Sequence, residues 1–244
     1  MGQSKVEVMK LKETPFETDM FVGYDNLGGV YAVKNNSLQK VFSGSSFNFS
    51  NVQLGNISSS NIFNPLKINL FYKNFNTVIF LDNRLTEILK LDFNALTPYK
   101  NVTHLSTGPD TTLWIFNQDI QQLELFDYKT RKTRTTGLPV STKVLSLTSN
   151  YNYCWLLTEA YLYQYNYMGS LLYKLPNNGF TEIVQWQDYV VAKKGSNLFV
   201  IVPNLENPLK IELPELLIKQ FSITGETLYI YDSKKLHEFQ LIIN

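Results

Sequence analysis

The chain has 244 residues, of which 44% are hydrophobic and 14% are aromatic, enough for a large packed core. Charged residues make up only 18% and the formal net charge is +1, which argues against binding to nucleic acid or to an anionic membrane. Cys154 is the only cysteine, so an internal disulfide is excluded, and no run approaches the roughly 18 apolar residues of a membrane-spanning helix.

The first predicted element is a strand from Lys5 to Lys12 (KVEVMKLK), in which apolar and polar residues alternate. It looks like two segments further along the chain, LTEILKLDF and PLKIELP. We therefore expect it to act as the outer strand of a β unit. The other strands of that unit must come from elsewhere in the chain, because no inner strands precede it.

A repeated unit of short strands and tight turns then runs along the chain. Each unit has an apolar core, and the cores begin at Val30, Leu70, Leu113, Cys154, Val190 and Leu228. A spacing of about 40 residues, built from four short strands, is typical of β-propeller blades. A seven-bladed ring would leave only about 35 residues per blade, so six blades fit the length better.

Outer strands follow these cores in five of the six units. They are predicted at Phe47 to Leu54, Leu85 to Phe93, Arg131 to Leu138, Leu171 to Leu175 and Pro208 to Pro214. The last unit ends after Leu236 to Ile243 and has no outer strand, so we expect Lys5 to Lys12 to complete it and to leave no exposed sheet edge. The sequence thus predicts an all-β fold: one domain, residues 1–244, forming a six-bladed β-propeller of four-stranded blades, the last closed by the N-terminal strand.

Three stretches fit the repeat less well. Ser43 to Ser60 is rich in Ser and Asn and is expected to bulge from the ring. Ala95 to Tyr99 and Pro214 to Ile218 are each long enough for one helical turn. No longer helix is predicted.

The most regular unit runs from Lys143 to Pro176. Cys154 lies in one of its apolar strands, which predicts a buried and unreactive thiol. Six tyrosines crowd this unit: Tyr151, Tyr153, Tyr161, Tyr163, Tyr165 and Tyr167. Since residues of one parity share a face of a strand, most of these rings are expected to pack between blades, and a few to suit a protein interface.

The predicted inner strands of the later units alternate apolar with small polar residues, as in Leu145 to Thr148, Val184 to Gln187 and Phe221 to Thr224. The strand period of two would direct the polar set toward a central channel. Two interpretations stay open: a wet funnel without a function, which we favour, and a specific ligand site.

Candidate catalytic and metal-binding residues are sparse. His104 and His237 fall in different blades, without cysteines or carboxylates at metal-ligand spacing. Asp25, Asp110 and Asp188 lie at turns, where Asp commonly caps backbone groups. The basic run Lys129 to Arg134 is interpreted as a solvated edge in an outer strand, with phosphate or acidic-partner binding as the alternative. We expect no enzymatic activity, no cofactor and no metal.

Loops joining the strands are the candidate partner-binding sites, because rigid scaffolds commonly present binding residues on loops. The candidates are Asn26, Asn74, Asn76, Asn117 and Asp119. Which rim of the ring they would form is not set by the sequence.

The segments LYQYNYMGSLLYKLP and LTEILKLDF resemble blades of six- to seven-bladed propellers of the bacterial cell envelope. The low-charge, Asn-, Tyr- and Phe-rich stretch from Phe71 to Asn94 is similar to periplasmic proteins of gliding bacteria. A stand-alone propeller of this size resembles the plug proteins of type 9 secretion translocons.

This resemblance covers the whole chain and carries over no functional residues. It implies a non-enzymatic propeller, located in the periplasm at the outer membrane. There it would dock on a larger envelope assembly and plug the periplasmic opening of a protein-secretion channel, with a large outer-membrane barrel as partner. The alternative is a periplasmic carbohydrate-binding or hydrolytic propeller that uses the central funnel.

Overall fold

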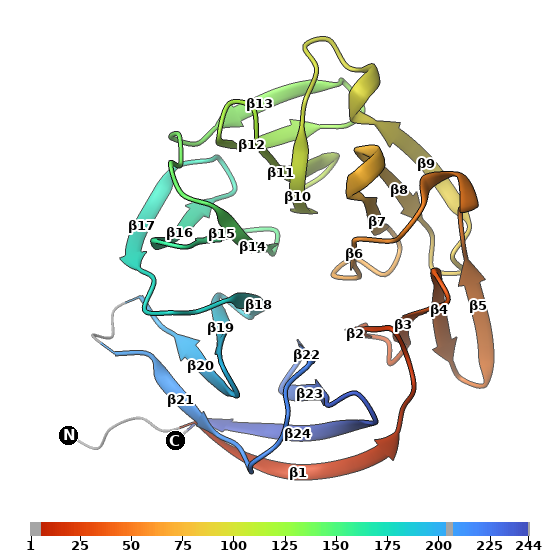
Figure 1. Cartoon of the computed structure of the whole chain (residues 1–244), viewed down its shortest axis with the longest axis vertical. Coiled ribbons are helices and arrows are strands. Elements are labelled where there is room, and N and C mark those ends of the chain that lie inside the picture. Colours follow the sequence, from red (N-terminus) through yellow and green to blue (C-terminus); the bar gives the residue numbers. More distant parts are fainter. Residues whose placement is uncertain (1–5, 204–206, 244) are drawn as a thin grey trace.

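The structure is a computed structural model that describes residues 6–203 and 207–243. Twenty-four strands make up the regular structure of this part, together with three 3-10 turns, η1 (Val52–Leu54), η2 (Lys73–Phe75) and η3 (Phe93–Ala95). None of the described helical segments is long and apolar enough to cross a membrane. The strands are arranged radially around a centre, as in a propeller (Figure 1).

Four of the sheets have four strands each, connected in chain order. The first contains β2 (Met20–Tyr24), β3 (Val30–Lys34), β4 (Ser37–Phe42) and β5 (Ser45–Phe49). The second contains β6 (Ser59–Asn61), β7 (Ile68–Tyr72), β8 (Thr77–Leu81) and β9 (Glu87–Asp92). The third contains β10 (Val102–Thr107), β11 (Thr112–Asn117), β12 (Gln122–Asp127) and β13 (Lys132–Thr136). The fourth contains β14 (Val144–Ser149), β15 (Tyr153–Thr158), β16 (Tyr161–Asn166) and β17 (Leu171–Pro176).

The fifth sheet has eight strands, in the order β18-β19-β20-β21-β1-β24-β23-β22. Its first half is formed by β18 (Glu182–Trp186), β19 (Tyr189–Lys194), β20 (Asn197–Ile201) and β21 (Leu209–Glu212). Its second half is formed by β22 (Gln220–Thr224), β23 (Thr227–Tyr231), β24 (Lys235–Ile243) and the N-terminal β1 (Val6–Pro15).

The N-terminal strand closes the ring as the sequence predicted. β1 pairs antiparallel with β24, from Val6 opposite Ile243 to Pro15 opposite Lys235, with a bulge between Lys10 and Lys12. The strand is longer than predicted, since it continues to Pro15; Lys5 lies outside the described residues. The first and last segments of the propeller are thereby held in one sheet (Figure 1).

The expected six separate sheets are found as four separate sheets and one of eight strands. The cause is that the start of β1 also pairs in parallel with β21, with Val6 opposite Ile211 and Glu7 opposite Glu212. Among the described residues, only these two pairs join the halves of the eight-stranded sheet. Sequence periodicity contains no signal for such a short bridge, because the bridge depends on which strand lies beside the other edge of β1 in the folded chain.

The burial of each strand follows from its radial position. Every residue of β7, β8 and β11 is buried, because these middle strands pack against neighbouring sheets on both faces. In β13 exposed and half-buried residues alternate instead, since an outer strand faces solvent along much of its length. The predicted cores beginning at Val30, Leu70, Leu113, Cys154, Val190 and Leu228 form the second strands of the four-strand units, as expected from their apolar runs.

Asx turns shape many of the connections between strands. Asp25 accepts hydrogen bonds from the backbone N–H groups of Leu27 and Gly29, and Asn166 accepts them from Met168 and Ser170. In a tight turn some backbone N–H groups have no backbone carbonyl to bond, and the short side chain of Asp or Asn accepts their hydrogen bonds instead. This explains why Asp and Asn recur at these positions. The predicted capping role of Asp25 is confirmed.

Two contact surfaces flank the first sheet. The closing seam lies between β2–β5 and β22–β24, and its buried apolar core is small: Phe21, Tyr231 and Leu236. The first seam lies between β2–β5 and β6–β9, and its buried core is larger and mostly aliphatic: Tyr31, Val33, Leu38, Leu54, Ile57, Ile68, Leu70, Tyr72, Ile79, Leu81 and Leu85.

The stretch from Ser43 to Ser60 is only partly irregular. It contains β5, the 3-10 turn η1 and the start of β6, so it continues the first sheet and begins the second. Of the two predicted helical turns, one is displaced to η3 (Phe93–Ala95), and the other, Pro214 to Ile218, has no helix.

Candidate functional site

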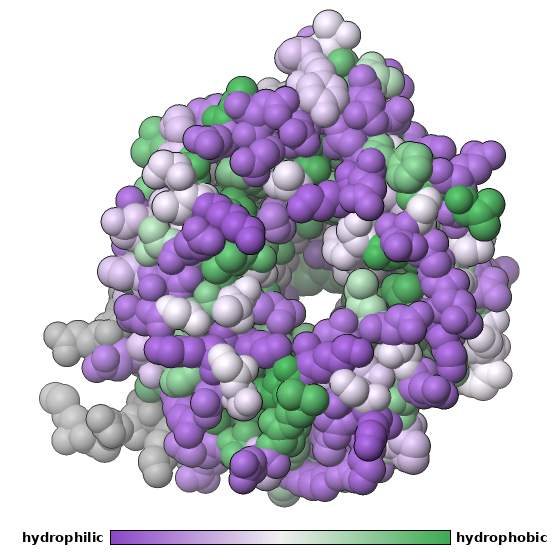
Figure 2. All heavy atoms as spheres, viewed as in Figure 1, coloured by the Kyte–Doolittle hydropathy of each residue, from purple (hydrophilic) through white to green (hydrophobic). Residues whose placement is uncertain are grey.

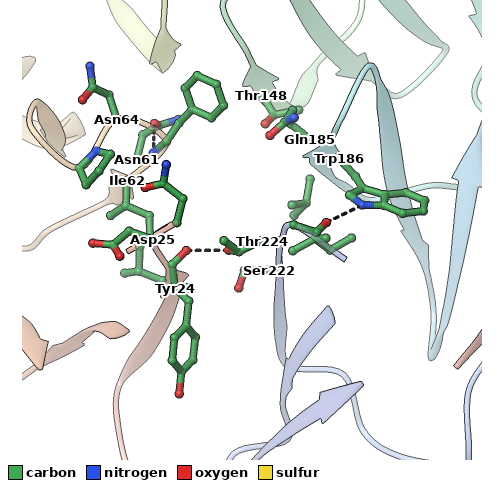
Figure 3. A pocket seen from close by; sticks show the side chains of 18 of the residues that line it. Tyr24, Asp25, Asn61, Ile62, Asn64, Thr148, Gln185, Trp186, Ser222 and Thr224 are labelled. Carbon is green, nitrogen blue, oxygen red and sulfur yellow. Dashed lines mark hydrogen bonds between the residues drawn. The ribbon is translucent and has the colours of Figure 1, made fainter. Parts of the chain in front are cut away.

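A cavity of about 910 Å³ lies at the centre of the ring. It is lined by β2, β6, β14, β18 and β22 and by the turns that follow them. Each of these strands ends its sheet and therefore has one edge without a strand partner in the described part of the chain. Figure 2 shows the opening at the centre of the molecule, and Figure 3 shows the residues of the wall. The volume lies in the range of ligand-binding pockets.

The turns at this cavity belong to one rim of the ring. Strands alternate in direction within each sheet, so the turns after the inner strands share one rim, and the turns between second and third strands share the other. The cavity is lined by Leu27, Leu66, Tyr151 and Glu226 from turns of the first kind. We call this rim the funnel rim.

Several polar side chains of the inner strands join neighbouring sheets. Ser149 donates to Ser106 Oγ at 2.7 Å, and Thr224 donates to the Tyr24 carbonyl at 2.7 Å. Asn61 donates to Ser106 Oγ at 3.1 Å and accepts from Thr107 Oγ1 at 2.9 Å. These groups hold the inner ring together and are not free for a ligand.

Other polar groups of the wall have unused hydrogen-bonding capacity. Ser222 is 9% exposed, and its Oγ has no hydrogen-bond partner among the described residues. Gln185 uses its amide N–H on the Gln187 carbonyl at 2.8 Å, which leaves its carbonyl oxygen for another partner. Thr148 lines the cavity beside Gln185 (Figure 3). The alternating pattern of the inner strands therefore has two uses, joining sheets and lining the funnel.

Asp25, a carboxylate deep in the wall, is committed to the fold. It lies 3.3 Å from the Lys40 ammonium, and both side chains are buried. Burial by itself would raise the pKa of Asp25, but hydrogen bonds from Gly29, Tyr31 and Leu27, together with Lys40, outweigh it and lower the pKa. A carboxylate that stays ionised and fully paired is poorly suited to general acid or base catalysis.

Exposed apolar side chains surround the mouth of the cavity. Leu27 is 56% exposed, Leu66 is 65% exposed and Tyr151 is 45% exposed. The Tyr151 ring meets Phe63 edge-on, with 4.9 Å between the ring centroids, so turns of two different sheets touch over the mouth. A group of exposed apolar side chains at one mouth is suited to contact with another molecule.

The remaining reactive residues lie away from the cavity wall. His237 contacts Asp232 at 2.7 Å and Glu13 at 3.4 Å in the ring closure. Burial and the nearby Lys73 lower the pKa of His104 to about 4, so this histidine is neutral at pH 7. Among residues 6–203 and 207–243, no group of three or more His, Cys, Asp and Glu side chains could hold a metal ion.

Cys154 and the basic run are placed as the sequence predicted. Cys154 is fully buried, and burial raises the pKa of its thiol well above the usual value. The basic run forms the turn into the outer strand β13, where Arg134 pairs with Asp127 at 2.6 Å. Neither position lines the cavity.

The five predicted interface residues do not form one surface. Asn26 is exposed on the funnel rim, whereas Asn74 and Asp119 are exposed in turns between second and third strands, on the opposite rim. Asn76 and Asn117 are buried: Asn76 bonds the backbone of Lys100 and Val102, and Asn117 donates to Glu124. Their role in partner binding stays a prediction, with only three of the five side chains accessible.

The apolar mouth was not among the features predicted from the sequence. Its signal is an apolar residue inside a turn, as in Asn26-Leu27-Gly28 and Asn64-Pro65-Leu66. Turn residues of this kind have no core to enter. The alternating direction of consecutive strands is a second signal in the sequence, because it shows which turns share a rim: it places Asn26 and Asn74 on opposite rims.

The fold is shared with solved propellers of low sequence identity. Virginiamycin B lyase from Staphylococcus aureus is 12% identical, with a TM-score of 0.61, and the match covers 93% of this chain and 80% of that one. A streptogramin B lyase is 10% identical, with a TM-score of 0.61 and 98% of both chains covered. The Pan2 WD40 domain from Neurospora crassa is 8% identical, with a TM-score of 0.60, covering 87% of this chain and 72% of that one.

No protein-family model matches the sequence, and no curated protein matches it significantly. The structural neighbours establish a β-propeller with four-stranded units. One fold can serve different functions, so this likeness shows the fold alone and the chemistry of the site must be used to argue the function.

Proposed function

We propose that this protein is a non-enzymatic propeller that docks onto a partner protein through its funnel rim. The observation that carries the proposal is the ring of exposed apolar side chains, Leu27, Leu66 and Tyr151, around a cavity whose deep carboxylate, Asp25, is already paired. Reversible protein interfaces combine buried apolar contacts with polar and water-mediated ones, and this rim offers both kinds of group.

The architecture proposed for this function is a six-bladed ring in one domain. The eight-stranded sheet counts as two blades, since two residue pairs join its halves in the described part of the chain. Each half has its own inner strand, β18 or β22, at the centre. A closed ring of this kind is stiff, which suits a module that acts by occupying space.

The chemistry of the cavity favours binding over catalysis. The described lining residues include no histidine, no cysteine and no lysine, and their carboxylates are Asp25 and Glu226. Glu226 is exposed and accepts a hydrogen bond from Gln240 at 2.9 Å, whereas Asp25 is buried. Neither forms a nucleophile–base pair of the kind that hydrolases use.

The finer proposal is that the partner is a large outer-membrane barrel and that the propeller plugs the periplasmic opening of a protein-secretion channel. It is supported by the resemblance of the chain to envelope propellers and by the low content of charged residues. A plug must leave when cargo arrives, and a contact of few exposed apolar groups with a polar surround is readily reversed.

The test of docking uses the native host. The tagged protein is purified with detergent-extracted membranes, and wild type is compared with Leu27→Asp/Leu66→Asp and with Val52→Asp. Val52 is 90% exposed on the opposite rim and is the matched control. We expect the double variant to lose about tenfold or more in partner affinity and the control to keep it.

Loss of the plug is tested separately. Deletion of the gene is expected to increase outer-membrane permeability to a large antibiotic, and the Val52→Asp protein is expected to restore the barrier. Unchanged permeability and the absence of any co-purifying barrel would reject the plug proposal. Equal loss of partner binding in the Val52→Asp control would reject the funnel rim as the docking surface.

A second candidate function is carbohydrate binding in the funnel. It is supported by the aromatic pair Phe63 and Tyr151 at the mouth and by the uncharged amide and hydroxyl groups of the wall. Binding of a neutral glycan to a soluble, partner-free protein would favour it over docking.

A further inference from the structure

We infer that the funnel receives an extended, uncharged segment of the partner protein that inserts an apolar side chain. This inference rests on the proposed docking function and specifies how the funnel rim is used. Four features of the cavity lead to it: its charge, its free hydrogen-bonding groups, an aliphatic band in its wall and the apolar mouth.

The charge of the cavity selects against an acidic segment. The described lining residues include no lysine, arginine or histidine, and Lys40 is paired with Asp25 behind the wall. The exposed Glu226 stands at the mouth and is the one lining carboxylate without a cationic partner among the described residues. A carboxylate entering here would lose hydration without gaining a cation, which is strongly unfavourable.

The free polar groups match a peptide backbone. The Gln185 carbonyl has remaining capacity, and the inner strands have one edge that pairs with no other described strand. An extended segment carries one N–H and one C=O per residue and needs such partners when it leaves water. A helix would not use them, because its backbone groups are already bonded to each other.

An aliphatic band lies in the same wall. It favours a peptide over a sugar as the ligand of the funnel. Val22, Ile62, Val184 and Ile223 line the cavity and are half-buried. Gly23 brings the Ile62 side chain close, since a Cβ at Gly23 would lie 3.4 Å from Ile62 Cδ1. Sugar hydroxyls would find no partner on this band, whereas an apolar side chain would bury area there.

The neighbouring inner strands β2 and β6 are less connected than β2 and β22. No hydrogen bond joins β2 to β6 among the described residues, whereas β22 is tied to β2 by Thr224 to the Tyr24 carbonyl and by the Phe21 N–H to Gln220. In Figure 3 Asn61 and Ile62 lie across the cavity from Thr148 and Gln185, whereas the Trp186 ring points away from it and donates to the Gly225 carbonyl.

The direct test uses a random peptide library displayed on phage and selected on the wild-type protein alone; the selected peptides are then measured on Thr148→Trp. Thr148 is half-buried in the wall, and a tryptophan there narrows the funnel without removing a described side-chain hydrogen bond. Gln118→Trp, exposed in the β11–β12 turn on the opposite rim, is the matched control. Thermal unfolding of both variants shows whether they are folded.

We expect selected peptides to be poor in Asp and Glu and to share one large apolar residue. Their affinity is expected to fall about tenfold or more in Thr148→Trp and to be unchanged in Gln118→Trp. Enrichment of acidic peptides, peptides insensitive to both variants, or no enrichment at all would overturn the inference. So would binding of a neutral oligosaccharide from a glycan array that Thr148→Trp abolishes.

The native partner separates this inference from the docking proposal. If the partner co-purifies equally with wild type and folded Thr148→Trp, docking stands and funnel insertion is rejected. If no partner co-purifies with wild type, docking itself fails, whatever the peptide selection gives. If the partner is lost only in Thr148→Trp, both are supported.

Discussion

The closing seam and the first seam join the same sheet, β2–β5, to its two neighbours by different means. The first seam buries a large aliphatic core, including Ile68, Ile79 and Leu81. The closing seam buries three apolar residues and relies on ring contacts and hydrogen bonds. There Tyr24 stacks on Tyr229 at 4.2 Å, and Phe16 meets Tyr231 edge-on at 5.9 Å.

The difference reflects how each seam forms. The first seam joins segments that follow each other in the chain, so non-directional apolar burial is sufficient to hold it. The closing seam joins the two ends of the chain, which must be brought together at an entropic cost and in one register. Directional contacts, such as the Tyr231 hydroxyl to the Thr18 carbonyl at 3.0 Å, set that register.

The largest expected effect comes from removing the closure itself. Deletion of the first twelve residues removes most of β1 and exposes the edge of β24, so we expect aggregation or a loss of stability above about 4 kcal/mol. Size-exclusion chromatography and thermal unfolding measure it. A deletion variant that melts like the full chain would contradict the closure.

Point mutations give a second form of this test, because residues of β1 differ in whether they face the core or solvent. Val6 is buried in the core of the eight-stranded sheet, whereas Met9 is 53% exposed. We expect Val6→Asp to destabilise strongly and Met9→Asp to have little effect, because only the first places a charge in an apolar core.

The next effect tests the aliphatic core of the first seam. Ile79 is fully buried there, and Ile79→Ala is expected to lower the free energy of unfolding by about 2–5 kcal/mol through lost burial and a cavity. Urea unfolding gives the value. A cost well under about 1 kcal/mol would mean that this seam does not depend on close packing.

A matched pair of tyrosines compares the two seams directly. The Tyr231 hydroxyl bonds to the backbone of Thr18 in the closing seam, so Tyr231→Phe is expected to cost about 1–2 kcal/mol. The Tyr72 hydroxyl is buried in the first seam without a hydrogen-bond partner among the described residues, so Tyr72→Phe is expected to be neutral or stabilising. Equal effects would remove the distinction between directional and non-directional seams.

The smallest expected effect is the pH dependence of the closure. Hydrogen bonds from Lys10 and Lys235 lower the pKa of Glu13 to about 2, from 4.5. Because the folded pKa is the lower one, the stabilisation is fully present above pH 4.5 and is lost as the pH falls toward 2. Glu13→Gln is therefore expected to flatten the decline in melting temperature between these pH values.

Salt provides the control for this pH effect. Glu13, Lys10 and Lys235 form their ion pairs at the surface, so about 1 M NaCl is expected to weaken the difference between wild type and Glu13→Gln. A difference that persists unchanged in high salt would indicate that the Glu13 side chain acts through packing instead.

Much of the fold could be predicted because it depends on local pattern. The apolar cores from Val30 to Leu228, the Asp and Asn turns and the likeness of Lys5 to Lys12 to later outer strands are all contained in short stretches of sequence. The sheets of a propeller repeat one pattern of strands and turns, so the pattern found in one unit helps to identify the next unit. The buried state of Cys154 followed from the same periodicity.

The candidate site was less predictable because it depends on which partner each polar residue meets. Thr224 and Ser222 are two positions apart in one strand, yet Thr224 bonds Tyr24 across the closing seam and Ser222 keeps a free hydroxyl among the described residues. Asn74 and Asn76 share one turn, yet only Asn74 is exposed, while Asn76 bonds the backbone of another sheet. Residue type and parity are alike in each pair.

The sequence by itself determined the strand repeat, the turns and the closure of the ring by the N-terminal strand, since these follow from hydrophobic periodicity and turn chemistry within a few residues. Only the tertiary structure decided that β1 also bridges to β21 and that Leu27, Leu66 and Tyr151 surround one mouth. It also decided which polar groups of the inner strands remain free. These outcomes depend on distances between segments far apart in the chain, and local patterns contain no information about such distances.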